Sequence, residues 1–126
     1  LVEDAVSKGA KLVAGSGKAK DGVLMDATLL DHVTPAMKIY SEESFGPICV
    51  VIRAGNEDEA VRIANDSEYG LSSAVFSTNI PRAMDVAKRI ESGICHINSP
   101  TGKTKHVGRN LRPAASLNIQ LRRGEA

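Results

Sequence analysis

The sequence predicts an α/β fold made mainly of parallel strands that are joined by crossover helices. Strand-like and helix-like segments alternate between residues 48 and 98 in the order β-α-β-α-β. The run from Ile48 to Ile52 is continuously apolar, as in a central strand buried on both faces of a sheet. Parallel neighbours need crossover connections, and the two intervening helical segments supply them. A chain of 126 residues has the length of one domain.

The first 30 residues predict a helix followed by two short strands. Residues 1–9 place apolar side chains at helical spacing and end at Gly9, which suits a left-handed helix cap. The segments 11–14 and 22–30 have the composition of strands. The polar stretch between them, residues 15–21, is expected to be a loop.

The next helix is predicted from its capping residues. Asn56 is suited to cap the N-terminus, and Glu59 occupies the third helical position of a capping box. The apolar stripe of this helix is expected to be Ala60, Ile63 and Ala64. The sequence Tyr69-Gly70-Leu71 marks its end.

A strand, a helix and a further strand follow over residues 73–98. Residues 73–77 predict the first strand, and Pro81 opens the helix. Met84, Ala87 and Ile90 are expected on its buried side. Gly93 ends the helix, and residues 94–98 predict the last strand.

The charge and composition of the chain change after Thr101. Residues 1–101 carry 10 Lys and Arg against 14 Asp and Glu, a net charge of −4, whereas residues 102–126 carry 6 against 1, a net charge of +5. Residues 102–126 show no sustained period and no aromatic residue, so they are expected to form a basic, poorly ordered tail. Without aromatic interleaving or a reading motif, this tail does not predict nucleic-acid binding.

The composition is that of an ordinary globular protein, with 42% hydrophobic and 25% charged residues. No apolar run is long enough to span a bilayer, so neither membrane insertion nor a membrane partner is expected, and a cytoplasmic location follows. Cys49 and Cys95 lie in apolar runs and lack the spacing of a disulfide framework or a metal site. They are expected to be reduced, buried thiols, and no metal is predicted.

A set of motifs between residues 42 and 98 resembles the NAD(P)-dependent aldehyde dehydrogenase family. The motifs occur in the order and spacing of that family, and jointly they are far more specific than Phe-Gly-Pro alone. They are Glu42-Glu43-Ser44-Phe45-Gly46-Pro47, Asn56-Glu57-Asp58-Glu59-Ala60, Ala64-Asn65-Asp66-Ser67-Glu68-Tyr69-Gly70-Leu71, Ala74-Val75-Phe76 and Ser92-Gly93-Ile94-Cys95-His96-Ile97-Asn98.

This resemblance implies that residues 1–101 are a fragment of an aldehyde dehydrogenase catalytic domain. The family oxidises an aldehyde to a carboxylic acid, with NAD or NADP as the hydride acceptor. A cysteine nucleophile and a water-activating glutamate perform the chemistry, and both family positions precede the matched segment. The fragment alone is therefore expected to be inactive, with no catalytic residue of its own.

The resemblance also implies roles for three residues. Glu43 matches a residue that accepts hydrogen bonds from the hydroxyls of the nicotinamide ribose, and Phe45 would pack beside the cofactor. A carboxylate suits a vicinal diol because it offers two acceptor oxygens in one plane. Asn98 matches a position near the catalytic pocket with a supporting hydrogen-bonding role.

The family pattern is lost after Asn98, because residues 99–126 lack the expected Pro-Phe-Gly-Gly-x-Lys-x-Ser-Gly segment. This chain alone is therefore expected to bind the cofactor poorly, because affinity needs several converging groups. The alternative interpretation is a non-catalytic interaction or oligomerisation module, which associates with itself or with a full-length relative through uncovered apolar surface.

Three other sequence features favour structural interpretations. Adjacent strand residues point to opposite faces, so Cys95 and His96 are not expected to form a catalytic dyad. Burial would make Cys49 inert as a nucleophile. The Gly15-Ser16-Gly17-Lys18 segment lacks the first glycine of a phosphate-binding loop and is expected to be a plain turn.

Overall fold

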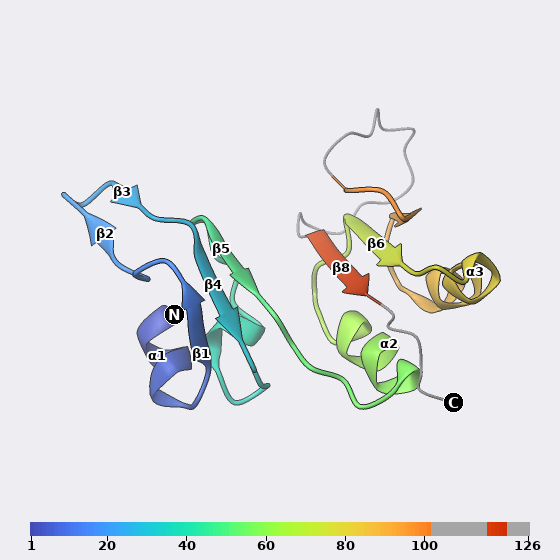
Figure 1. The fold of residues 1–126 in the computed structure, drawn as a ribbon, viewed down its shortest axis with the longest axis horizontal. Helices are drawn as coiled ribbons and strands as arrows, with labels where there is room; N and C mark the ends of the chain where they lie inside the picture. Colours follow the sequence, from blue (N-terminus) through green and yellow to red (C-terminus); the bar gives the residue numbers. More distant parts are fainter. Residues whose placement is uncertain (102–115, 121–126) are drawn as a thin grey trace. The chain divides into compact units, whose positions relative to one another are not determined.

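The computed structural model describes residues 1–101 and 116–120, and the contacts within the chain form two compact units (Figure 1). Unit 1 is Leu1–Arg53 and unit 2 is Ala54–Ala126. The contacts thus divide the chain between Arg53 and Ala54, whereas the sequence places its boundary after Thr101. Each unit has its own hydrophobic core.

Unit 1 contains one α-helix, a short 3-10 helix and five strands. They are α1 (Val2–Ser7), β1 (Lys11–Ala14), β2 (Ala19–Lys20), β3 (Leu24–Met25), β4 (Thr28–Asp31), η1 (Lys38–Tyr40) and β5 (Ile48–Val50). Gly9 has a φ of +104°, as predicted for the residue that ends the first helix. The prediction of one strand over residues 22–30 is wrong, because β3 pairs with β2 across an Asp21-Gly22 turn whereas β4 pairs with β1.

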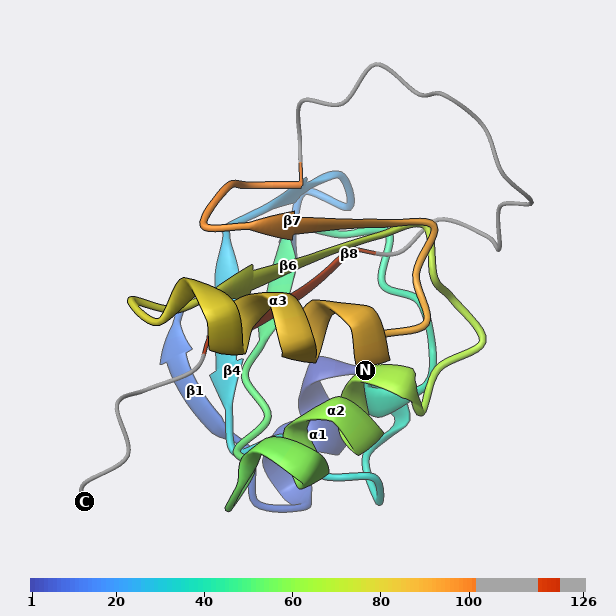
Figure 2. The same ribbon diagram turned by 90° about the vertical axis from the view of Figure 1, so that its right-hand side faces the viewer.

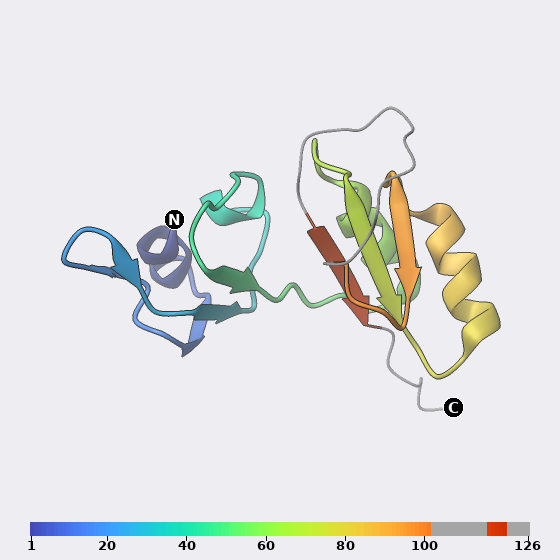
Figure 3. The ribbon, with the colours of Figure 1, turned by 90° about the horizontal axis from the view of Figure 1, so that it is seen from above.

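Strand β5 lies at the edge of the sheet in unit 1 and not at its centre, which corrects the prediction from its apolar run. The strand order is β1-β4-β5, with β1 antiparallel and β5 parallel to β4 (Figure 3). Ile48 and Val50 are half-buried, and Cys49 between them is exposed. The predicted burial of Cys49 is therefore also wrong. Among the described residues, β5 pairs with β4 on one side and with no strand on the other.

The core of unit 1 forms where α1 and η1 pack together beside the sheet. Leu30 of β4 is fully buried at its centre. The other buried members are Val2, Ala5, Ala10, Val33, Met37 and Ile39. The segment between η1 and β5 is thus joined at both ends to a packed core.

An ion pair joins Asp31, the last residue of β4, to Arg53, which lies three residues after the end of β5. Arg53 Nε donates to Asp31 Oδ1 at 2.9 Å, and Arg53 Nη2 donates to Asp31 Oδ2 at 2.5 Å. The hydrogen bonds from Arg53 are the main reason that the pKa of Asp31 falls from 3.8 to about 2, and a bond from the His32 amide adds to them. This two-point contact is the strong geometry for such a pair.

This ion pair predicts a specific acid sensitivity. The carboxylate of Asp31 is favoured in the folded state, so its contribution to the unfolding free energy is complete above pH 3.8 and is lost as the pH falls towards 2. Asp31→Asn removes that contribution, so the stability of the variant should fall less steeply over this interval. Urea unfolding at pH 7, 4 and 2.5 measures the difference, and parallel pH curves for the two proteins would contradict the assignment.

The described residues of unit 2, 54–101 and 116–120, form two helices and three strands. They are α2 (Glu57–Asn65), β6 (Ser72–Phe76), α3 (Ile80–Arg89), β7 (Ile94–Ile97) and β8 (Ser116–Gln120). The sheet has the order β7-β6-β8, and both neighbours of β6 are parallel to it. Helix α3 is the crossover from β6 to β7 and packs against both strands, which confirms the predicted unit (Figure 2).

The predicted continuous β-α-β-α-β arrangement over residues 48–98 is nevertheless wrong at its first strand. Strand β5 pairs with β4 of unit 1, and β8 takes the other side of β6. Residues 116–120 form this strand within the tail that was expected to be poorly ordered. Their five residues are too few to show a period in the sequence, and they are held by backbone pairing to β6.

Side-chain caps fix the starts of both helices of unit 2. Asn56 Oδ1 accepts a hydrogen bond from the amide of Glu59 at 2.9 Å, as predicted. The Glu59 carboxylate accepts from the amide of Gly55 at 2.8 Å, one residue before the position of a standard capping box. Asn79 Oδ1 caps α3 by accepting from the amide of Arg82 at 3.0 Å.

The buried faces of these helices differ from the predicted stripes. Helix α3 buries Ala83 and Val86, and Ile90 at its C-cap is buried as predicted, whereas Met84 is 47% exposed. Helix α2 buries Val61 and Ala64 and ends at Asn65, before the predicted exit at residues 69–71. The faces are set by contact with one side of the sheet, which contributes Val75, Cys95, Ile97 and Ile119 to the same core.

Charged side chains also join α2 to α3. Arg82 Nε lies 2.6 Å from Glu57 Oε2, and Arg89 Nη1 lies 3.2 Å from Glu57 Oε1. Arg89 Nη2 in addition lies 2.5 Å from Asp58 Oδ1. Asn65 bridges the same helix ends, because its Nδ2 donates to the carbonyl of Arg89 and its Oδ1 accepts from the amide of Glu91. Within residues 1–101 and 116–120, no helix is both long and apolar enough to cross a bilayer.

Candidate functional site

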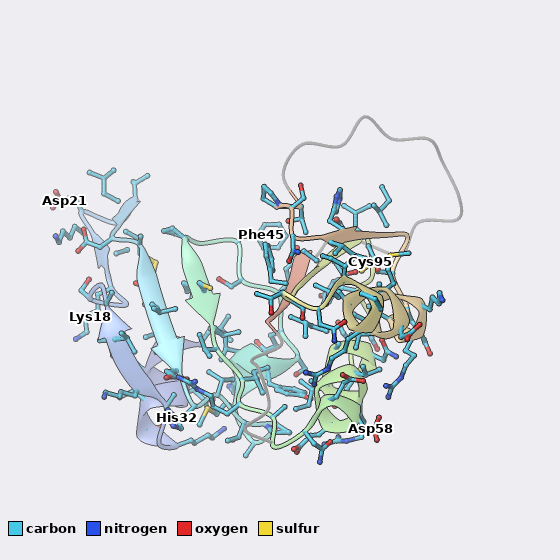
Figure 4. All side chains as sticks on the ribbon, turned by 45° about the vertical axis from the view of Figure 1, so that its right-hand side comes forward. Lys18, Asp21, His32, Phe45, Asp58 and Cys95 are labelled. Atoms are coloured by element: carbon cyan, nitrogen blue, oxygen red, sulfur yellow. The ribbon has the colours of Figure 1, made fainter. Side chains whose placement is uncertain are left out.

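The loop between η1 and β5 presents the first two predicted site residues, Glu43 and Phe45. Glu43 is exposed, and the Phe45 ring is 95% exposed (Figure 4). No hydrogen bond or ion pair joins the Glu43 carboxylate to any other described residue. Both side chains are therefore open to an incoming ligand.

Backbone hydrogen bonds hold this loop at both ends. At its start, the amide of Glu42 donates to the carbonyl of Lys38 at 2.9 Å. At its end, the carbonyl of Pro47 accepts from the amide of Thr28 at 2.8 Å. The loop is thus anchored to η1 and to β4, while its middle carries a carboxylate and an aromatic ring. A carboxylate beside an aromatic ring can bind a sugar hydroxyl pair and pack against a flat ring system.

Asn98 lies in unit 2, directly after β7, and its side chain is fixed by two hydrogen bonds to Ser77. Asn98 Oδ1 accepts from the Ser77 amide at 2.8 Å, and Asn98 Nδ2 donates to the Ser77 carbonyl at 2.9 Å. Its backbone amide also donates to the carbonyl of Val75 at 2.9 Å. The residue has a φ of +53°, which asparagine tolerates better than most residues.

The structure thus brings Glu43 and Phe45 together on one loop of unit 1, and it places Asn98 at the end of a strand in unit 2. Sequence reasoning missed Ser77, the partner of Asn98. The signal for this contact was the position of both residues directly after neighbouring parallel strands, whose carboxyl ends lie at one edge of a sheet.

The other residues that were considered from the sequence have surroundings typical of structural residues. Cys95 is half-buried and packs against the core of unit 2, while strand alternation directs His96 to the opposite face of the sheet. In the Gly15–Lys18 segment, Ser16 Oγ contacts the backbone of Lys18, and Lys18 Nζ lies 4.0 Å from Glu3. Among the described residues, no group of three or more His, Cys, Asp or Glu side chains is arranged to hold a metal ion.

Comparison with known proteins places these residues in a family. The model of the aldehyde dehydrogenase family matches residues 1–109, which extends the match beyond Thr101. Vanillin dehydrogenase of Pseudomonas sp. strain HR199 is 55% identical over 101 residues, which are 80% of this chain and 21% of that protein.

Solved structures agree with the sequence comparison. Salicylaldehyde dehydrogenase from Pseudomonas putida G7, complexed with salicylaldehyde, superposes with a TM-score of 0.78 at 56% identity, covering 82% of this chain and 21% of that one. NADP-dependent glyceraldehyde-3-phosphate dehydrogenase from Bacillus halodurans, complexed with NADP, gives a TM-score of 0.74 at 42% identity, covering 80% and 21%. The chain spans about a fifth of the length of these relatives. With most of its residues matched by the family model, the chain belongs to the aldehyde dehydrogenase family.

Proposed function

We propose that this chain is the cofactor-facing part of an NAD(P)-dependent aldehyde dehydrogenase, and that the complete polypeptide containing it oxidises an aldehyde to a carboxylic acid. The observation that carries the proposal is the loop that contains Glu43 and Phe45, in a chain of this family. Among the described residues the Glu43 carboxylate has no hydrogen-bond or ion-pair partner, and the Phe45 side chain is almost fully exposed. When bound, NAD or NADP supplies the hydride acceptor.

The residues of the loop fit one end of such a cofactor. Glu43 has two acceptor oxygens available, so it can accept hydrogen bonds from both hydroxyls of a ribose. Phe45 offers a large uncovered apolar surface two residues away, against which a flat ring can pack. The relative from Bacillus halodurans was solved with NADP, which supports a nicotinamide dinucleotide as the ligand.

Asn98 serves the same reaction without direct contact with the reacting atoms. Its amide is bonded to Ser77, so we assign it a supporting role at the pocket. The family resemblance assigns the nucleophilic cysteine and the base that activates water to family positions outside the segment that this chain matches. Residues 1–126 alone therefore bind the cofactor weakly and do not turn over an aldehyde.

A nicotinamide absorbance assay tests this proposal. We expect the complete polypeptide to reduce NAD or NADP in the presence of an aldehyde, and the 126-residue chain to show no turnover under the same conditions. The aldehydes should include vanillin and salicylaldehyde, after which two relatives are named, and an aliphatic aldehyde for comparison. Turnover by the isolated chain would contradict the assigned absence of a nucleophile.

The second candidate function is an interaction or oligomerisation module, with a homo-oligomer as the simplest product. The hairpin formed by β2 and β3 favours it, because Val23 is 86% exposed and Leu24 is 69% exposed. A two-stranded hairpin is marginally stable alone, and exposed apolar side chains favour association. A monomeric sedimentation profile that is unchanged by added full-length enzyme would contradict this candidate. For either function we propose a cytoplasmic location, which two free cysteines support.

A further inference from the structure

Asn98 continues the pairing of β6 and β7 beyond the last residues of the strands. The final pair of the ladder is Val75 with Ile97. At Asn98 the backbone turns into a left-handed conformation and leaves the sheet, while its side-chain amide takes up the next position along β6. The amide donates to and accepts from Ser77 as a peptide group in a strand would.

Ser77 connects this contact to the start of α3. The hydroxyl of Ser77 accepts a hydrogen bond from the amide of Asn79 at 3.1 Å. Asn79 in turn caps α3 through the amide of Arg82. We call Asn98, Ser77 and Asn79 the edge clamp, since they join the exit of β7, the exit of β6 and the entry of the crossover helix.

The edge clamp lies at the carboxyl ends of parallel strands. In open α/β sheets, ligands bind outside these ends. The direction in which the chain leaves β7 therefore decides where residues 99–101 stand relative to that edge. Two hydrogen bonds of 2.8 and 2.9 Å fix both the plane of the amide and the backbone that carries it.

We propose that Asn98 is a positioning residue for aldehyde oxidation that acts through Ser77, by fixing the path of the chain after β7. The inference rests on the proposed function, and it adds Ser77 and Asn79 to the residues on which the reaction depends. It also separates the role of Asn98 from substrate contact, because its amide is directed at the backbone of Ser77.

Amide hydrogen exchange on the 126-residue chain tests the clamp without any assay of activity. Asn98→Gly retains the positive φ and removes the side-chain amide. We expect the Ser77 amide to exchange about 10-fold faster, as for the loss of a typical hydrogen bond. Asn98→Asp retains an acceptor for that amide but sets a second oxygen against the Ser77 carbonyl, so it should restore only part of the protection. A Ser77 amide that exchanges equally in the wild type and in Asn98→Gly overturns the proposal.

Asn65 provides a matched control. Its side chain also donates to one backbone carbonyl and accepts from one backbone amide, but it joins the ends of α2 and α3. Asn65→Ala should accelerate exchange at Glu91 and leave Ser77 unchanged. Acceleration at Ser77 in this variant would show that its protection reports the stability of the whole unit, which overturns the proposal.

Kinetics of the complete polypeptide test the positioning role. We expect Asn98→Gly to lower kcat about 10-fold with an unchanged KM for the cofactor, and Asn65→Ala to keep kcat within about 2-fold. Equal loss of kcat in both variants overturns the positioning role. An inactive wild-type polypeptide overturns the proposed function and the catalytic role together, whereas the exchange data still decide whether the clamp exists.

Discussion

Glu43→Gln should weaken binding of NAD or NADP to the complete polypeptide by about 10- to 100-fold, the range expected for hydrogen bonds to a charged group. Glutamine keeps one acceptor oxygen and replaces the other with an NH2 group, which faces a hydroxyl donor with a donor of its own. No other described residue engages the Glu43 carboxylate, so its substitution leaves the fold intact. Titration calorimetry with each dinucleotide measures the change.

The neighbouring carboxylate provides the control for charge. Glu42 is also exposed, and Glu42→Gln makes the same change one residue away. We expect this variant to retain the affinity of the wild type within about 2-fold, because a single exposed charge in water contributes little. Equal losses in the two variants would mean that the loop attracts the cofactor only through its total charge, and the specific role of Glu43 would be discarded.

The second large effect is on stability. Leu30→Ala should lower the unfolding free energy of the chain by about 3 to 5 kcal/mol, the cost of a cavity in a well-packed core. Leu30 is 0% exposed and lies where β4 faces α1 and η1. Because stabilities of small domains are of similar size, we expect loss of the unit 1 fold at 37 °C. Urea denaturation followed by circular dichroism measures the loss.

Leu24→Ala is the matched control for this substitution. The residue type is the same, but Leu24 is on β3 and 69% exposed, so the loss should be within about 0.5 kcal/mol. A similar loss in both variants would mean that the β2–β3 hairpin is buried in solution, which would support association of the chain. The pair therefore separates the core of unit 1 from its exposed hairpin.

Local signals in the sequence predicted the elements of unit 2 well. Asn56 and Glu59 cap α2, Pro81 lies in the first turn of α3, and β7 begins directly after Gly93. These capping and turn residues act on positions only a few residues away, so they can be recognised in the sequence without knowledge of the fold. The exposed position of Glu43 and Phe45 likewise follows from a loop that contains Gly46 and Pro47.

Features that depend on distant partners could not be predicted. The apolar run at β5 suits a central strand, but among the described residues β5 pairs with β4 alone, which places it at an edge of the sheet. The choice between Ala83 and Met84 for the buried face of α3 depends on the direction from which the sheet packs. The bond between Asn98 and Ser77 joins residues 21 positions apart, so it follows from the pairing of β6 with β7 and not from a local sequence pattern.

The exposed edge strand β5 has a practical consequence for work with this protein. Of the two thiols in the sequence, Cys49 is exposed and Cys95 is half-buried. A maleimide dye should therefore couple first to Cys49 and mark the edge of the sheet without any engineered residue. Slower labelling in the complete polypeptide than in the 126-residue chain would show that another segment shelters this edge, and the same dye would then report its release.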